Sequence, residues 1–455
     1  MNPVRIAVAG GGISGLVAAH TLQQEASRQG VPIELSVLEA DAQAGGHARS
    51  VTDDGWVVER GPNGFLDRGE ETMALIDELQ LRSSLVEADP ASRRRFILQG
   101  GRLCRVPESP PALITCDALG WGGKLRLLRE PWAAAPPVDT DETVFEFAER
   151  RLGREAAETF VDTAVAGISA GDSRALSVRS QFPVLKEWEA AHGSLLKAML
   201  ARRKTGGARA RLMSLRRGVG MITAALSDRL DGSLRVQAPV VRIEKQGAEW
   251  RLGTSTGLSI EADRVLCALP SHVASAAAAG LDRNLSAALA SIPYAPIAVV
   301  ALGYPRSAIA RPLDGYGYLV TRQQGLSTLG VLWESSIFPG RAPADHVLLR
   351  VMLGGARHPQ VRELDDESVA SLAMREAATV LGITGEPARQ WVFRYPSAIA
   401  QYTVGHDGRT AAIRRALGAH RGLHVCGTAY DGVSFNDAVA SARKTARRVI
   451  EELAA

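Results

Sequence analysis

The chain has 455 residues, of which 46% are hydrophobic and 22% are charged. This length is about three times that of a typical domain of roughly 150 residues, and the composition is far from that of disordered chains, so we expect more than one packed unit. There are 53 basic and 49 acidic residues, and the resulting formal charge of +4 is too small by itself to indicate nucleic-acid binding.

The four cysteines, Cys104, Cys116, Cys267 and Cys426, share no metal-binding spacing and are too few for a disulfide framework. We therefore expect a cytoplasmic protein without a bound metal. The first residues carry neither the basic segment nor the cleavage site of a secretory signal. The most apolar stretch, residues 292–303, is interrupted by prolines and is shorter than the about 20 residues of a membrane span, so we expect no span.

The N-terminal residues predict a strand, a turn, a helix and a second strand. The strand covers 4–9, the turn 10–15, the amphipathic helix 16–29 and the second strand 33–38. This order is typical of one half of a dinucleotide-binding unit.

The middle of the chain predicts a helical insertion. A proline-rich amphipathic stretch at 107–137 precedes a charge-rich helix at 141–164. Residues 190–227 contain basic side chains and no acidic ones, a pattern that predicts a solvated flexible connector. The basic residues are Lys197, Arg202, Arg203, Lys204, Arg209, Arg211, Arg216 and Arg217.

Strand patterns return in the second half, where we expect an antiparallel sheet that faces a substrate. The predicted strands cover 234–244, 250–252, 265–269, 297–302, 318–320 and 347–353. A last strand at 423–427 leads through a glycine-rich turn into a final helix at 438–453.

The first turn fits the pattern G-x-G-x-x-G through Gly10, Gly12 and Gly15. Glycines at these positions let backbone N–H groups approach a pyrophosphate, and the helix dipole favours its charge. Glu39 ends the second strand, 24 positions after Gly15, where a carboxylate can accept hydrogen bonds from ribose hydroxyls. Together these features predict a dinucleotide site.

Two further glycine-rich segments favour FAD over NAD. The first combines Gly45 and Gly46 with a rigid turn at 59–65 that can approach a flavin ring. The second, at 427–435, leads into a helix whose N-terminal N–H groups can stabilise negative charge on a reduced flavin.

The chain resembles the FAD-dependent protoporphyrinogen oxidases of haem synthesis, in the amine oxidase superfamily, of the bacterial oxygen-dependent type. The motifs that carry the resemblance are GPNGFLD at 61–67, RRRF at 93–96, AGISAGD at 166–172, YAPIAVV at 294–300 and GGAR at 354–357. One departure is Gln43, which stands where the superfamily usually has an arginine, so one contact to the cofactor is expected to be weaker.

The resemblance implies an α/β fold of the amine oxidase and p-hydroxybenzoate hydroxylase type. Residues 1–90, 212–290 and 405–455 are expected to form a Rossmann-like FAD domain. Residues 91–106 and 291–404 would form a substrate domain with a mixed or antiparallel sheet, and 107–211 the helical insertion.

The resemblance also implies the reaction, which is removal of six hydrogens from protoporphyrinogen IX in three two-electron steps, with O2 reduced to hydrogen peroxide. Coproporphyrinogen III, with four propionates in place of two, is an alternative substrate, and Arg93 and Arg94 are the candidate extra cations. Another flavin amine oxidase, a carotenoid desaturase and an inactive porphyrin-carrying flavoprotein are further alternatives.

Individual site residues follow from the same resemblance. Asn63, near the flavin N5, and the Gly167 carbonyl, near the carbon that loses hydride, are the expected catalytic groups. Arg95 is expected to bind a propionate, and Leu319, Leu332 and Met352 to contact the macrocycle. Residues expected to bind FAD are Gly10, Gly12, Ser14, Gly15, Glu39, Ala40, Gly46, His47, Gly61, Pro62, Asn63, Gly64, Val240, Gly427, Val433, Ser434 and Phe435. His406 and His424 are expected in structural positions.

The expected partners are the porphyrinogen, O2, a membrane surface and a chelatase that takes the product, and a homodimer is a further expectation. Residues 107–132 mix leucines and tryptophans with basic side chains, which suits an anionic membrane surface as well as a cap over the active site. Location would then be cytoplasmic, peripheral on the inner face of the cell membrane.

Overall fold

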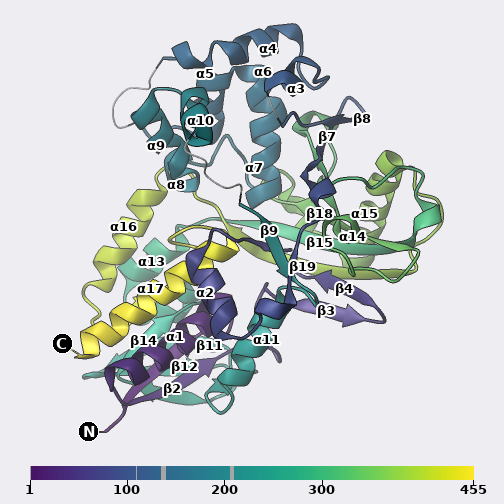
Figure 1. Cartoon of the computed structure of the whole chain (residues 1–455). Coiled ribbons are helices and arrows are strands. Elements are labelled where there is room, and N and C mark those ends of the chain that lie inside the picture. The colour runs from purple at the N-terminus through teal and green to yellow at the C-terminus, as the bar shows by residue number, and fades with distance from the viewer. Residues whose placement is uncertain (1, 109, 135–139, 205–209, 455) are drawn as a thin grey trace.

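The computed structural model of the chain describes residues 2–108, 110–134, 140–204 and 210–454 (Figure 1). Two sheets dominate it, with a helical unit at the top of Figure 1 and both termini at the lower left. The fold is α/β, a Rossmann-like sheet joined to a mixed sheet and a helical insertion.

A five-stranded parallel sheet has the order β10-β2-β1-β14-β20. Its strands are β1 (Val4–Ala9), β2 (Ile33–Leu38), β10 (Leu234–Arg235), β14 (Arg264–Cys267) and β20 (Leu423–Val425). Helices α1 (Ile13–Gln29) and α17 (Phe435–Ala454) pack against each other and bury their apolar sides in one core with α11 (Gly220–Arg229). The order of strand, turn, helix and strand predicted from the first residues is confirmed, but the helix begins at Ile13, so the last residues of the predicted turn at 10–15 are helical.

The opposite face of this sheet is covered by a small antiparallel sheet and two helices, with Trp250 buried among them. These are β11 (Val240–Gln246), β12 (Glu249–Thr254), β13 (Ser259–Ala262), α12 (Ser271–Ala278) and α13 (Arg283–Ala290). The single strand predicted at 234–244 is therefore wrong, because β10 and β11 belong to different sheets. The chain turns between them at Gln237, whose φ is +54° and whose N–H bonds to the Asp41 carbonyl.

A seven-stranded mixed sheet has the order β19-β15-β18-β17-β16-β7-β8, and only the β7–β16 pair is parallel. Its strands are β7 (Arg95–Gln99), β8 (Arg102–Arg105), β15 (Tyr294–Pro305), β16 (Gly317–Val320), β17 (Thr328–Trp333), β18 (His346–Gly354) and β19 (Arg389–Ala400). Helix α15 (Asp366–Leu381) covers one face with small residues, Ala370, Ala373 and Ala377, so this face is core. The opposite face is left for other groups.

Shorter elements join the two sheets. They are β3 (Ser50–Asp53), β4 (Trp56–Glu59), β5 (Phe65–Leu66), α2 (Glu70–Glu78), β6 (Leu85–Glu87), β9 (Leu212–Leu215), α14 (Glu334–Ile337) and α16 (His406–Leu417). Strand β9 pairs with both β5 and β6, which fixes the chain around residues 61–67.

The helical unit lies above the large sheet in Figure 1, and α7 descends from it toward that sheet. Its elements are α3 (Pro110–Ile114), α4 (Trp121–Leu128), α5 (Val144–Leu152), α6 (Arg154–Ala156), α7 (Asp162–Ser169), α8 (Val178–Gln181), α9 (Pro183–His192) and α10 (Leu195–Lys204). The continuous helix predicted at 141–164 is wrong, because Gly153 adopts φ +89° and ends α5, and a π-helical turn at 157–161 precedes α7. None of the helices in the described ranges is both long and apolar enough to span a membrane.

The flexible connector predicted at 190–227 is also wrong for most of its length. It contains α10, the buried strand β9 and α11, although Arg209 lies outside the described residues. Two of its basic side chains have partners that are distant in sequence: Arg211 pairs with Asp67 at 2.7 Å, and Arg216 donates to the Ser83 carbonyl at 2.7 Å. Composition alone could not reveal these partners.

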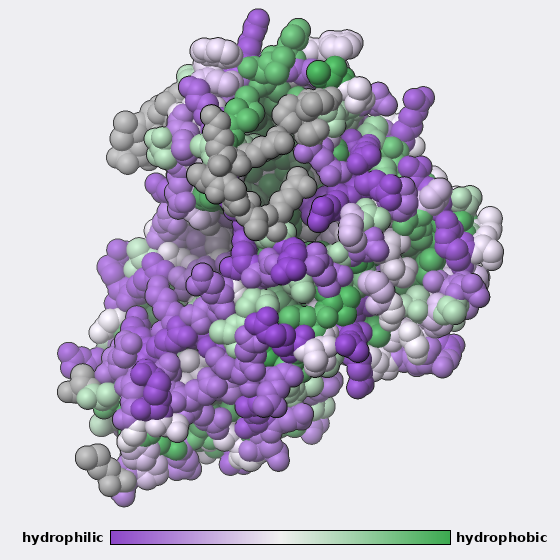
Figure 2. All heavy atoms as spheres, in the orientation of Figure 1, coloured by the Kyte–Doolittle hydropathy of each residue, from purple (hydrophilic) through white to green (hydrophobic). Residues whose placement is uncertain are grey.

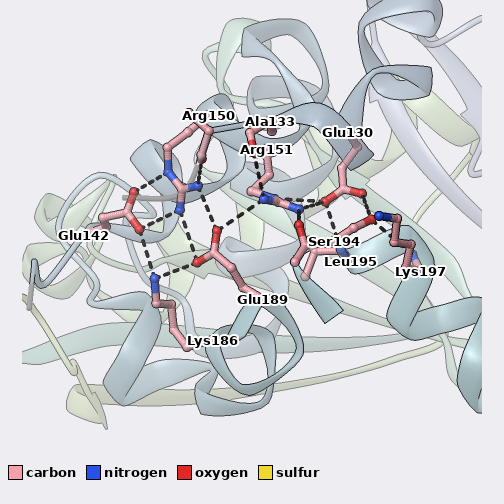
Figure 3. Close-up of polar contacts among 12 residues, drawn as sticks. Glu130, Ala133, Glu142, Arg150, Arg151, Lys186, Glu189, Ser194, Leu195 and Lys197 are labelled. Carbon is pink, nitrogen blue, oxygen red and sulfur yellow. Dashed lines mark hydrogen bonds and ion pairs between the residues drawn. The ribbon is translucent and has the colours of Figure 1, made fainter. Parts of the chain in front are cut away.

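Buried charges hold the helical unit together (Figure 3). Arg151 pairs with Glu130, and the two side chains are only 1% and 3% exposed. Glu130 also accepts hydrogen bonds from the Ser194 hydroxyl at 2.5 Å and from the Leu195 N–H at 2.9 Å, at the start of α10. Glu189 pairs with Arg151 at 3.4 Å and extends the network. One carboxylate therefore joins α5 to α10.

Neighbouring charges continue this network toward α9. Arg150 pairs with both Glu142 and Glu189 at 2.8 Å, and Lys186 pairs with Glu189 at 2.7 Å. Each buried carboxylate thus has more than one cationic or N–H partner, which is the condition under which buried ion pairs are tolerated.

We expect Glu130→Gln to destabilise the helical unit by about 3 kcal/mol, because it removes the nearer of the two carboxylates that neutralise the buried Arg151 and leaves only Glu189 at 3.4 Å. Arg154→Gln is the control, since its pair with Glu158 is solvent-exposed and should contribute at most about 1 kcal/mol. Urea denaturation followed by circular dichroism measures both. Equal effects of the two substitutions would contradict this role of Glu130.

Candidate functional site

Backbone groups form an open cradle at the carboxyl edge of the parallel sheet, where β1, β14 and β20 end. Gly10 has φ +100°, and its carbonyl oxygen lies 1.8 Å from the place a Cβ at position 15 would occupy, so Gly15 cannot carry a side chain. A Cβ at Gly12 would meet nothing within 4 Å, and Gly12 precedes α1 without any capping side chain. These residues fit a pyrophosphate, whose oxygens would accept hydrogen bonds from the free N–H groups of the helix terminus.

Glu39 lies at the same edge, 8% exposed. Its carboxylate accepts hydrogen bonds from the Gly11 N–H and the Asp41 N–H, each at 2.8 Å, and retains lone pairs for ribose hydroxyls. The adjacent Ala40 is exposed, and Val240 begins β11 just after Ala238, whose N–H bonds to the Glu39 carbonyl. The predicted Glu39, Ala40 and Val240 thus lie together.

Gly11 was not among the predicted site residues. A Cβ there would lie 2.8 Å from the Glu39 Cβ, so the carboxylate can reach the loop only because position 11 is glycine. The run of three glycines at 10–12 was the available signal.

Arg49 supplies a guanidinium to the loop in which Gln43 replaces the usual arginine. It donates to the Gln43 carbonyl at 3.1 Å and the Gly46 carbonyl at 3.0 Å, and it pairs with Asp41 at 2.7 Å. Gly45 in turn donates its N–H to the Gly11 carbonyl. A cation therefore lies on this loop, but from a position that the motif comparison did not indicate.

The loop at 61–64 requires its glycines for close packing. A Cβ at Gly61 would lie 2.5 Å from the His47 carbonyl oxygen, and one at Gly64 would lie 2.4 Å from the Met213 carbonyl oxygen. Pro62 and Asn63 lie between them. The loop is therefore held between the His47 segment and β9.

Three hydrogen bonds tie the loop to the seven-stranded sheet. Tyr395 donates to the Arg60 carbonyl at 3.1 Å, Arg350 donates to the Gly61 carbonyl, and the Asn63 amide donates to the Tyr316 hydroxyl at 3.1 Å. Arg350 is neutralised by Glu334 at 2.8 Å, and both side chains are at most 4% exposed. The loop thus joins the cofactor cradle to the sheet.

The imidazole of His47 packs edge-on against Tyr395, with 4.5 Å between ring centroids. Protein atoms surround the ring closely, although part of the residue is exposed to solvent. Burial, together with Arg49 and Arg60, lowers the pKa of His47. At neutral pH the ring is therefore uncharged.

The C-terminal glycine segment faces the cradle. Gly427 has φ +119°, and a Cβ there would come 3.6 Å from the Ser14 hydroxyl oxygen. Ser434, after Val433, donates its hydroxyl to Asp437 at 2.6 Å and caps α17, and Phe435 stacks on Phe65 in the core at 5.6 Å. The Ser434 N–H also donates to Asp437 at 3.0 Å and its carbonyl accepts from the Ala438 N–H, so of these two residues it is Phe435 whose backbone N–H is left to contact a cofactor.

Tyr402 fixes the segment at 427–435 through two hydrogen bonds. Its hydroxyl donates to the Thr428 carbonyl at 2.9 Å and accepts from the Gly432 N–H at 2.7 Å. His406 stacks on Tyr402 with 3.8 Å between centroids, and neither ring nitrogen has a partner. Burial lowers the pKa of His406 to about 4. Both His406 and His424 are buried, which confirms their structural positions.

The strand register brings the four predicted substrate residues onto one face of the large sheet. Gly317 is paired with both Arg95 and Leu332, and the neighbouring row pairs Leu319 with Gly330 and Gly330 with Met352. Paired residues, and residues two apart on one strand, share a face. This is the face opposite α15, and it is the one to which the 61–64 loop is tied.

Gly167, on α7, meets this face at Leu319. A Cβ at Gly167 would lie 2.5 Å from the Leu319 Cδ2, so only glycine allows the helix backbone to lie so close. The helix is anchored by the buried Asp162, which pairs with Arg322 at 3.1 Å and Arg357 at 2.8 Å. These cations hold the pKa of Asp162 below its usual range.

Arg95 is exposed at the edge of this face, with its guanidinium over the Tyr316 ring at 5.2 Å. No carboxylate of the described ranges forms an ion pair with it. Arg94, in contrast, is paired with Asp314 at 3.3 Å, and Arg93 is exposed. Of the three arginines, Arg95 has the position and the free charge to bind an anionic group at the site.

No local pattern indicated Tyr316, Tyr395 or the Arg350–Glu334 pair, because the groups they contact are distant along the chain. No group of three His, Cys, Asp or Glu side chains within the ranges described is arranged to hold a metal.

Comparisons with known proteins show what this chain is similar to. The model of the family "Flavin containing amine oxidoreductase" matches residues 13–450. The chain is 34% identical to the protoporphyrinogen oxidase of Homo sapiens, over 98% of each chain, and 28% identical to the coproporphyrinogen III oxidase of Bacillus subtilis, over 95% of each chain. A crystal structure of an inferred protoporphyrinogen oxidase from Exiguobacterium sp. 255-15 has a TM-score of 0.87 at 25% identity, covering 99% of this chain and 100% of that one.

We expect His406 to destabilise the protein in acid. The unfolded chain binds a proton at the ordinary pKa near 6.5, whereas the folded ring stays neutral down to about pH 4, so this stability is present above pH 6.5 and is lost as the pH falls toward 4. His406→Phe keeps the stacking and removes the titration. Its free energy of unfolding should therefore fall less than that of the wild type between pH 7 and 4, by on the order of 3 kcal/mol. Parallel pH profiles from urea denaturation would contradict this.

Proposed function

This chain belongs to the family of flavin-containing amine oxidoreductases. From its porphyrinogen-oxidising relatives, we propose that it oxidises protoporphyrinogen IX to protoporphyrin IX. The chain is an FAD-dependent oxidase. Three two-electron steps remove six hydrogens, and three O2 become three H2O2. The observation that carries the proposal is the sheet face that joins Arg95, Leu319, Leu332 and Met352 beside the 61–64 loop.

The chemistry of this face suits a porphyrinogen. The macrocycle is large and apolar and carries propionates along one edge, so its site needs a wide apolar surface and a cation at the rim. Leu319, Leu332 and Met352 offer the surface, Gly330 leaves room between them, and Arg95 offers the free charge. A guanidinium can bind a carboxylate through two parallel hydrogen bonds.

Bound FAD supplies the hydride acceptor and the reaction with O2. The chain's own residues orient the substrate and exclude water. Asn63, held by Tyr316, would contact the reacting edge of the flavin, and the Gly167 carbonyl would face the carbon that loses hydride. Neither group needs to act as an acid or base, because orientation and electrostatics suffice for hydride transfer to a cofactor.

Coproporphyrinogen III is the second candidate substrate, supported by the likeness to the Bacillus subtilis enzyme. It would need cations for four carboxylates. Arg94 is already paired with Asp314, so Arg93 is the additional arginine of this run whose charge is free for that purpose. The pairing of Arg94 favours the substrate with two propionates.

We also propose that the helical unit lies against an anionic membrane surface. Figure 2 shows hydrophobic side chains gathered over this unit at the top of the molecule, with hydrophilic side chains beside them. The exposed apolar residues there include Ile114, Trp121, Leu125, Leu128 and Trp132, of which Trp132 is 81% exposed. Substrate would enter from the lipid side. Transfer of the porphyrin to a chelatase and formation of a homodimer stay predictions.

The direct test of the reaction is aerobic incubation of the FAD-loaded protein with each porphyrinogen, following porphyrin fluorescence and hydrogen peroxide. We expect protoporphyrinogen IX to have the higher kcat/KM. Oxidation of amines or carotenoids with no porphyrin formed would contradict the proposed function, and faster oxidation of coproporphyrinogen III would reverse the order of the two substrates.

Arg95→Ala should raise KM by about tenfold with little change in kcat, because the carboxylate anchor acts equally on ground state and transition state. Arg94→Ala is the matched control and should leave KM within about twofold, since its charge is already paired at the surface. Steady-state kinetics measure both. An unchanged KM in Arg95→Ala would remove Arg95 from the substrate site.

Membrane contact is tested by sedimentation with vesicles. We expect the protein to pellet with vesicles rich in anionic lipid, and the double variant Trp121→Ser/Trp132→Ser to bind about tenfold more weakly. Val241→Ser, which alters an exposed valine of the cofactor unit, is the control. Equal binding by all three proteins would exclude this face as the contact.

A further inference from the structure

The side chain of Tyr316 lies on the face of the sheet opposite to the one that regular strand alternation predicts for it. Along β16 the side chains alternate, and Tyr318 is buried on the opposite face in the core formed with α15. Two positions before it, Tyr316 should point the same way. It packs instead against the cluster of Leu332, Ile337 and Phe338, on the face of the site, and Met352 packs against the same cluster.

Gly317 is the cause of this reversal. Its φ is +129°, a value that side-chain-bearing residues rarely adopt, and a Cβ there would lie 2.0 Å from the Val331 carbonyl oxygen. On either side the backbone is fixed, since the Tyr316 N–H bonds to the Arg94 carbonyl and its carbonyl accepts from the Trp333 N–H. The chain therefore holds this one side chain over the site.

The side chain of Tyr316 makes two contacts there, one with a residue at the cofactor end of the proposed site and one with a residue at its substrate end. Its hydroxyl oxygen accepts the hydrogen bond from the Asn63 amide at 3.1 Å, and its ring lies beneath the guanidinium of Arg95 at 5.2 Å. Burial raises the pKa of Tyr316, so the hydroxyl is neutral at the pH of catalysis.

We propose that Tyr316 is a positioning residue that links the cofactor end of the site to the substrate-anchoring end. Its hydroxyl fixes the orientation of the Asn63 amide, and its ring fixes the direction of the Arg95 guanidinium. This inference rests on the proposed function, which assigns the roles of Asn63 and Arg95.

Two substitutions separate the contacts. Tyr316→Phe keeps the ring and removes the hydroxyl, so kcat should fall by about fivefold while KM changes by less than about twofold. Tyr316→Leu also removes the ring, so KM should rise as well, by about threefold. Tyr318→Phe removes a hydroxyl from the opposite face of the same strand and should change neither constant.

A double-mutant cycle distinguishes positioning from a general loss of structure. If Tyr316 acts through Asn63, Tyr316→Phe should have no further effect on kcat in an Asn63→Ala background. The visible circular dichroism of the bound FAD gives a readout that does not depend on turnover. It should change alike in Tyr316→Phe and Asn63→Ala and stay unchanged in Tyr318→Phe.

Additive losses of kcat in the cycle, or an FAD spectrum in Tyr316→Phe identical to that of the wild type, would overturn the role of Tyr316. A wild-type protein that oxidises no porphyrinogen would instead contradict the proposed function. The two failures are therefore distinguishable, and the spectra still test the link between Tyr316 and Asn63.

Discussion

The ion pair between Arg350 and Glu334 holds the two halves of the site in register. Arg350 projects from the middle of β18 and donates to the carbonyl of Gly61, so the seven-stranded sheet is fastened to the loop that borders the cofactor cradle. Both charges are almost fully buried, and removal of either partner would leave an unpaired charge in the interior. The distance between the apolar sheet face and the 61–64 loop thus depends on this pair.

Buried ion pairs also fix other elements that border the site. Asp162 holds α7 through Arg322 and Arg357, which sets the close contact of Gly167 with Leu319. Glu130 and Arg151 hold the helical unit from which α7 descends. Such pairs contribute little net stability compared with apolar packing, but their geometry is specific, which is what a preorganised site requires.

Glycines solve the complementary problem of bringing backbones together. Gly15, Gly61, Gly64 and Gly167 each stand where a Cβ would collide with a neighbouring backbone or side chain. The spacing of these glycines along the chain made the loops at 10–15 and 61–64 predictable. The register of the strands beside each loop then determines where the predicted residues of that loop lie. Glu39 was predictable for the same reason, because a short strand and a short helix determine where the second strand ends.

Other features could not be derived from local patterns, because their causes are distant in sequence. The helix at 141–164 was expected to be continuous since its composition favours helix throughout, yet Gly153 ends it and a π-helical turn follows. The basic segment after residue 190 appeared solvated because its acceptors, Asp67 and the Ser83 carbonyl, lie more than a hundred positions away. Tyr316 departs from the alternation of its strand because Gly317 reverses it, and no periodicity in the sequence indicates a φ of +129°.

The central claim is that the cofactor cradle and the apolar sheet face form one reaction site. Rapid mixing of the FAD-loaded protein with protoporphyrinogen IX in the absence of O2 tests it most directly. The account predicts that the absorbance of the oxidised flavin bleaches at least as fast as steady-state turnover. A flavin that stays oxidised after mixing, in protein that binds the porphyrinogen, would contradict it.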